Sequence, residues 1–84
     1  MYVVYLLQSK VDRSFYIGFT TDIKQRLRRH NSRQVLSTKS KVPWKLIFFE
    51  GFVNRLDARN REVYLKSGWG RRSIQKILKE SFKQ

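Results

Sequence analysis

The sequence predicts an α+β fold, a small three-stranded antiparallel sheet flanked by helices, with its elements in the order ββαβαα. Two runs rich in aromatic and β-branched residues stand close together near the N-terminus, and a third lies near the middle of the chain. Apolar residues at helical spacing follow the second and the third run. With 84 residues, the chain suits a single domain that spans residues 1–84.

The three runs are the predicted strands. Tyr2 to Leu7 (YVVYLL) and Phe15 to Phe19 (FYIGF) are separated by the polar, turn-like segment Lys10 to Ser14. So short a link indicates an antiparallel hairpin. The third strand is Trp44 to Phe52 (WKLIFFEGF), and Pro43 is tolerated at its start.

The first helix is predicted to start at Thr20, Thr21 and Asp22. A threonine side chain can cap free backbone N–H groups, and an aspartate suits the positive end of a helix. Ile23 and Leu27 lie four residues apart and give this helix an apolar face.

A polar stripe runs beside that apolar face. Asp22, Arg26 and His30 follow one another at spacings of four residues. Taken alone, His30 is explained as a helix-end group, which is favourable near the negative terminus. A basic, hydroxyl-rich loop, Ser32 to Pro43, follows the helix.

The second helix is predicted to begin after Asn54, which can cap it. Leu56 and Val63, and also Ala58 and Leu65, repeat at seven residues. We expect both pairs to mark the buried side of this helix.

The segment Ser67 to Gly70 (SGWG) is expected to break the helical pattern. A short last helix is then predicted, with Ile74, Ile77 and Leu78 as its apolar stripe.

The charge of the chain is strongly unbalanced. Nineteen Lys and Arg face six Asp and Glu, which gives a net charge of +13. This imbalance predicts a polyanionic partner, and nucleic acid is favoured over an anionic membrane. The longest apolar run, Tyr2 to Leu7, has only the length of a strand, and the N-terminus carries no signal-peptide pattern. We therefore predict no membrane association and a cytoplasmic, nucleoid-associated location.

The composition excludes several kinds of site. The chain has no cysteine, so disulfides, zinc knuckles and thiol nucleophiles are excluded, and its one histidine excludes a multi-histidine metal site. Six carboxylates, none adjacent in sequence, argue against a two-metal nuclease site. A site with one Mg²⁺ held by a single carboxylate stays open, because Mg²⁺ keeps most of its waters.

Asp22 and Asp57 are explained as first-turn residues of helices, whereas Glu62 has no such explanation. It lies in the middle of the second helix, close to the border between the buried face and solvent. The helix pattern alone favours an ion pair with Lys66 over a functional role.

Tyr5 and Tyr16 lie on neighbouring predicted strands. Core packing with each hydroxyl at the surface is the simpler explanation. A tyrosine can also serve as a general base where a cation lowers its pKa, and Arg26 is in a position to supply that cation and to grip a phosphate.

Together these residues resemble the GIY-YIG nuclease family, specifically its small stand-alone bacterial members, and are similar to the N-terminal nuclease domain of excinuclease C. Val3 to Tyr5 (VVY) stands where the family has GIY, and Tyr16 to Gly18 (YIG) matches letter for letter. Arg26 falls at the position of the catalytic arginine, and His30 falls where members carry His or Tyr. Leu56 to Lys66 (LDARNREVYLK) resembles the A-x-x-R-E-x-x-x-K helix of the family.

The resemblance implies a DNA endonuclease that depends on one divalent metal, Mg²⁺ or Mn²⁺, and a role in DNA repair or recombination. It implies that Tyr5 is the general base, with Tyr16 beside it in a shared water network, although either tyrosine can take the proton. Arg26 is implied as the phosphate clamp, Glu62 as the sole protein ligand of the metal, and His30 as a relay or positioning group.

Three departures from the family pattern are visible. Val3 replaces the glycine of GIY, and Phe19 follows YIG where some members carry a lysine. Some members also have an active-site asparagine after the metal glutamate, whereas this chain has Ser67 to Arg72 (SGWGRR) there. Leaving-group assistance is therefore not assigned to a residue.

The remaining basic residues are candidates for phosphate contacts, which give affinity but no choice of sequence. Gly18 is expected to let a phosphate approach the backbone closely. Trp44 and Trp69 can stack on unpaired bases, but core packing of Trp44 and loop packing of Trp69 are favoured. The candidates for phosphate contacts are Arg28, Arg29, Arg33, Lys39, Lys41, Lys45, Arg71 and Arg72.

Two other functions remain open at this stage. One is a non-catalytic nucleic-acid-binding module on the same fold, and the other is a basic adaptor or ribosome-associated protein. No element reads as a base-specific recognition device, so a protein partner is a candidate source of specificity. The chain is expected to be a monomer or a weak homodimer.

Overall fold

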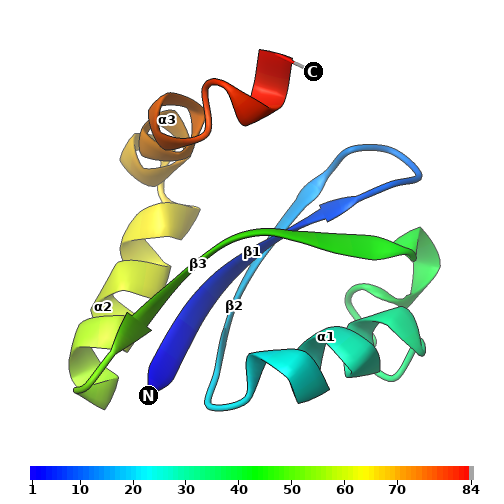
Figure 1. Ribbon diagram of the computed structural model, residues 1–84, viewed down its shortest axis with the longest axis horizontal. Helices are drawn as coiled ribbons and strands as arrows, with labels where there is room; N and C mark the ends of the chain where they lie inside the picture. The colour runs from blue at the N-terminus through cyan, green and yellow to red at the C-terminus, as the bar shows by residue number, and fades with distance from the viewer. Residues whose placement is uncertain (84) are drawn as a thin grey trace.

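The three predicted strands form one antiparallel sheet in the computed structural model, which describes residues 1–83 (Figure 1). The strands are β1 (Tyr2–Ser9), β2 (Phe15–Thr20) and β3 (Trp44–Phe52), and β1 lies in the middle of the order β2-β1-β3. This confirms the α+β class and the order ββαβαα.

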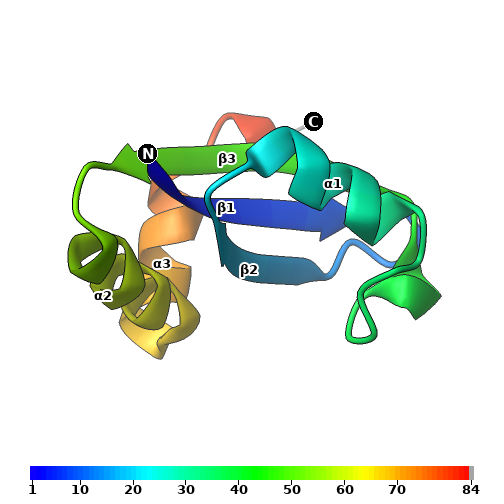
Figure 2. The same cartoon turned by 90° about the horizontal axis from the view of Figure 1, so that it is seen from below.

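The helices lie on both faces of this sheet. They are α1 (Ile23–Asn31), α2 (Arg55–Lys66) and α3 (Gly68–Ile77), with short 3₁₀ turns at Lys39–Lys41 and Ser81–Lys83. Figures 1 and 2 show α1 on the opposite side of the sheet from α2 and α3. None of the helices within residues 1–83 is long and apolar enough to cross a membrane.

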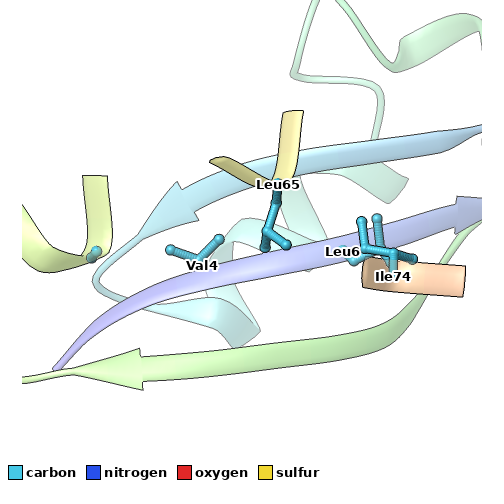
Figure 3. Close-up of a cluster of buried hydrophobic side chains, with 5 residues drawn as sticks. Val4, Leu6, Leu65 and Ile74 are labelled. Atoms are coloured by element: carbon cyan, nitrogen blue, oxygen red, sulfur yellow. The ribbon is translucent and has the colours of Figure 1, made fainter. Parts of the chain in front are cut away.

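Because side chains alternate along a strand, the central strand β1 is buried on both faces. Val4 and Leu6 point to the α2 and α3 side, where they pack against Ala58, Leu65 and Ile74 (Figure 3). These five residues are at most 4% exposed and form the first apolar core.

The opposite face of β1 carries a second cluster. Tyr5 and Leu7 pack there with Trp44, and Ile23 and Leu27 of α1 lie against them. The expected apolar face of the first helix and the core packing of Trp44 are thereby confirmed. Placing Tyr5 beneath α1 is the step that builds the site described below.

The buried side of α2 differs in part from the prediction. Ala58 and Leu65 are buried as expected, whereas Leu56 and Val63 are 66% and 70% exposed. Leu56 and Ala58 are two residues apart, which is about 200° around a helix. The two apolar pairs therefore lie on different sides of α2, and only one of them can face the sheet. Glu62 is buried instead, at 8% exposure.

The start of α3 also differs from the prediction. Ser67 ends α2, as expected, but the same residue caps α3, because its hydroxyl accepts the N–H of Gly70. The helix therefore begins at once, at Gly68. A side chain at Gly70 would overlap the backbone of Tyr64 and Leu65, so the glycine lets α3 approach α2 closely.

Candidate active site

The Tyr5 hydroxyl is held by two side chains of α1. Tyr5 is 1% exposed, and its hydroxyl lies 2.9 Å from Nε2 of His30. Arg26 donates its Nε–H to the same oxygen over 3.3 Å. Arg26 and His30 are one helical turn apart, so α1 presents both on one face to β1. The helix starts in the predicted region, but Asp22 and not a threonine is its cap, since Asp22 accepts the N–H of Gln25.

His30 is itself held from its other ring nitrogen. Its Nδ1 lies 2.7 Å from the hydroxyl of Thr38, and both residues are fully buried. We assign the Thr38 hydroxyl as donor to the carbonyl of Val35, 3.4 Å away, and as acceptor from Nδ1–H of His30. Nε2 is then free to accept the Tyr5 proton. The bonds therefore run in one direction, from Arg26 through Tyr5 and His30 to Thr38.

Sequence analysis did not find Thr38. It lies in the basic loop among several serines and threonines, and no spacing sets it apart. The structure fixes it through tertiary contacts, because the indole N–H of Trp44 donates to the Thr38 carbonyl over 2.9 Å. The side chain of Asn31 in turn bonds both the backbone N–H and the carbonyl of Trp44.

These contacts decide the charge of each group. Burial raises the pKa of Tyr5 above its usual value, although the hydrogen bond from Arg26 acts in the opposite direction. Burial, together with the positive charge of Arg26, lowers the pKa of His30 to about 4. Near neutral pH the site therefore holds a neutral phenol, a neutral imidazole and a charged guanidinium. Arg26 lowers the pKa of Tyr5 as expected, but burial outweighs it.

Tyr16 completes an aromatic cluster around His30. Its ring centroid lies 5.0 Å from that of His30 and 6.4 Å from that of Tyr5. Its edge also meets Trp44, with centroids 6.3 Å apart. The two tyrosines that the sequence singled out thus lie on the same face of the sheet.

Gly18 lies opposite Tyr5 in the pairing of β1 with β2. A side chain at this position would overlap the Tyr5 hydroxyl and ring. The glycine of the YIG motif therefore makes room for the phenol of Tyr5. Close approach of a phosphate to this backbone stays a prediction.

Glu62 projects from α2 and is paired through both carboxylate oxygens. Lys66 lies 3.2 Å from one oxygen, which confirms the expected ion pair, and Arg59 lies 3.0 Å from the other. The negative charge of Glu62 is the smallest of the causes that raise the pKa of Tyr5, after burial and Tyr16. Sequence analysis missed Arg59, whose guanidinium lies 3.9 Å from the ring centroid of Phe19. A cation therefore stands beside the residue that follows YIG.

The donor set suits a largely hydrated metal ion. Within residues 1–83, no three or more His, Cys, Asp or Glu side chains gather into a metal-binding group. Glu62 is a nearly buried carboxylate, and a single carboxylate is sufficient for Mg²⁺, which keeps several waters and shares phosphate oxygens.

The predicted phosphate contacts do not lie on one surface. All of these side chains are exposed, and Lys41 pairs with Asp12 over 3.4 Å. A first group of these basic residues comes from α1 and the loop after it, on the α1 side of the sheet, near the Tyr5 site. A second group lies on α3, on the other side of the sheet. The first group is Arg28, Arg29, Arg33, Lys39 and Lys41; Lys45 is on β3, and Arg71 and Arg72 are on α3.

Comparison with known proteins places the chain in a family. A family model described as the GIY-YIG catalytic domain matches residues 1–75. A UPF0213 protein of Clostridium perfringens is 35% identical over 85 residues, which cover 100% of this chain and 90% of that protein. A UPF0213 protein of Streptococcus pneumoniae is 41% identical over 64 residues, covering 75% of this chain but only 64% of the relative.

Among solved structures, the chain is similar to the solution NMR structure of a UPF0213 protein from Bacillus halodurans. The TM-score is 0.56 at 28% sequence identity, and the match covers 92% of this chain and 85% of that one.

Proposed function

Because the chain belongs to the GIY-YIG catalytic domain family, together with the UPF0213 proteins, we propose that it is a metal-dependent DNA endonuclease that hydrolyses phosphodiester bonds. The observation that carries the proposal is the Tyr5 hydroxyl held between Arg26 and His30. One hydrogen-bond partner would satisfy a buried tyrosine hydroxyl, whereas that of Tyr5 has two, and one of them is a cation. On this proposal residues 1–84 form one nuclease domain.

Glu62 would hold Mg²⁺ or Mn²⁺. When bound, such an ion neutralises charge on the scissile phosphate and supplies an activated water. Arg26 binds the phosphate and stabilises the charge that develops there. Its Nε–H bond to Tyr5 fixes the plane of the guanidinium, which a fork-like contact with phosphate oxygens requires.

Tyr5 moves the proton. Its oxygen receives a proton from the attacking water while its own proton passes along the existing hydrogen bond to Nε2 of His30. Thr38 holds His30 in the tautomer that can accept it. Tyr16 packs against the imidazole and limits its movement.

The test is cleavage of labelled single-stranded, duplex, flapped and four-way-branched DNA, each with Mg²⁺, with Mn²⁺ and with EDTA. Glu62→Gln and Tyr5→Phe should each lower metal-dependent cleavage by about 100-fold or more, while DNA binding stays close to that of the wild type. Arg26→Ala should lose far more activity than Arg33→Ala, which removes an exposed arginine from the loop after α1. Equal cleavage by wild type and Glu62→Gln would exclude this site as the nuclease centre.

One observation favours a second function, non-catalytic binding of nucleic acid. Both oxygens of Glu62 are already paired with cations. Salt-sensitive binding of all four DNA forms without any cleavage would support this alternative.

A further inference from the structure

Trp69 is a large aromatic side chain in contact with solvent. It is 70% exposed on α3, whereas Trp44, the only other tryptophan, is 4% exposed. The expected loop packing of Trp69 is wrong, because α3 begins at Gly68 and carries the indole on its outer surface. Several apolar side chains of the described residues are exposed singly, so the exposure of Trp69 gains meaning only from its surroundings.

The surroundings of this ring are cationic. The guanidinium of Arg72 lies 5.0 Å from the centroid of the Trp69 ring. Trp69, Arg72 and Lys76 follow one another at i, i+3 and i+7, so they form one stripe along α3. All three side chains are exposed. The stripe thus combines an aromatic face with positive charges in a row.

A second aromatic ring borders the stripe. Tyr64 of α2 is 40% exposed, and its hydroxyl lies 2.8 Å from that of Ser73. Ser73 is one turn after Trp69, so the two rings flank the same corner between α2 and α3. The guanidinium of Arg61 lies 5.4 Å from the Tyr64 ring.

This surface is separate from the Tyr5 site. Helix α3 lies on the other side of the sheet from α1. Tyr64 follows Glu62 by two residues, which is about 200° around α2, so the two side chains point in nearly opposite directions. None of the roles assigned to Tyr5, Arg26, His30 or Glu62 uses this corner.

We propose that Trp69 and Tyr64 stack on unpaired nucleobases and that Arg72 and Lys76 bind the neighbouring phosphates of a single-stranded segment. Aromatic rings and cations in alternation are what sequence-independent binding of single strands requires. A duplex keeps its base faces inside its own stack, so an exposed ring cannot reach them. The inference rests on the proposed function in one respect, that the partner is nucleic acid.

The experiment measures affinity by fluorescence anisotropy for a labelled single strand and for the blunt duplex of the same sequence. EDTA is present throughout, so that metal-dependent cleavage does not interfere. Trp69→Ala should weaken single-strand binding by about 5-fold to 100-fold, since stacking is worth about 1–3 kcal/mol per base. Trp69→Phe should restore most of the loss, because it keeps an aromatic face. Duplex affinity should change by less than about twofold in both variants.

Val63→Ala is the matched control. Val63 is also 70% exposed and lies on α2, but it has no aromatic face. Its truncation should leave single-strand affinity unchanged. A loss equal to that of Trp69→Ala would show general disturbance of this corner and would overturn the stacking proposal.

A second readout is the intrinsic emission of the protein. Oligothymidylate should quench the emission of wild-type protein, and the quenching should vanish in Trp69→Ala, where only the buried Trp44 remains. Unchanged affinity and absent quenching would overturn the inference and direct the search to a protein partner. Trp69-dependent binding without any cleavage would uphold it while refuting the nuclease proposal. Glu62-dependent cleavage without Trp69-dependent binding would support the nuclease proposal and overturn the stacking inference.

Discussion

The phenol ring of Tyr5 lies against the backbone of Gly18, its partner across β1 and β2. No side chain fits between them, because even a methyl group at position 18 would overlap the Tyr5 hydroxyl. The glycine of one motif thus positions the tyrosine of the other. This relationship explains why the two motifs act as a unit.

Gly18→Ala should therefore destabilise the protein by about 1–3 kcal/mol, because Tyr5 is buried and bonded and cannot move aside cheaply. The cost should fall sharply in a Tyr5→Ala background, where the added methyl has room. A double-mutant cycle by urea unfolding measures this coupling. An equal cost in both backgrounds would place the strain in the backbone and not in the contact with Tyr5.

The free energy of unfolding should decrease as the pH falls through the range in which His30 takes up a proton. Burial and Arg26 lower its pKa to about 4 in the folded state, below the ordinary value of 6.5. As the pH falls, the imidazole of His30 therefore takes up a proton in the unfolded chain before it does so in the folded protein. The contribution of neutral His30 to stability is complete above about pH 6.5 and is lost as the pH falls towards about 4. The expected loss is about 2 kcal/mol between about pH 7 and about pH 4.5.

Urea unfolding at several pH values checks this expectation. His30→Gln should lack the decline over the same range. The pKa of Asp12 is lowered to about 2, mainly by its hydrogen bonds from Ser14, so its effect belongs to more acidic conditions. A decline of equal size in His30→Gln would assign it to another group.

Thr38→Val should cost about 1–3 kcal/mol, because it leaves the buried Nδ1–H of His30 without an acceptor. Thr38→Ser keeps the hydroxyl and should remain close to the wild type. We further expect the valine variant to lose cleavage activity, since His30 is no longer fixed in one tautomer. Nitrogen chemical shifts of the imidazole report the tautomer directly. A wild-type shift pattern in the valine variant would contradict this role for Thr38.

Removing Arg59 should strengthen metal binding at Glu62. Arg59 occupies one carboxylate oxygen, and a divalent cation must compete with it. Arg59→Ala should raise Mn²⁺ affinity by about 1.4-fold to fivefold, which corresponds to the roughly 0.2–1 kcal/mol typical of a partly exposed ion pair. Titration calorimetry measures the affinity. Arg55→Ala, which removes an equal charge one turn earlier on α2, is the control.

If both variants bind Mn²⁺ alike, the change reflects only net charge and not competition at Glu62. Loss of Mn²⁺ binding in Arg59→Ala would mean that the arginine supports the site.

The sequence by itself determined the elements that depend on neighbouring residues. Runs rich in aromatic and β-branched residues set the strands, and the caps at Asp22 and Asn54 set the starts of α1 and α2. Spacing of one helical turn also placed Arg26 and His30 on a common face. These features are local, so a linear pattern contains them.

Only the tertiary structure decided which surfaces meet. Helix α2 has two apolar stripes, and packing against the sheet selected Ala58 and Leu65 over Leu56 and Val63. Thr38 bonds His30 because Trp44 holds the loop there, and Arg59 of α2 reaches the ring of Phe19 in β2. Such contacts join residues that are distant in sequence or on different elements, and their energy exists only once the sheet has brought them together. A pattern in one dimension therefore cannot encode which partner each side chain finds.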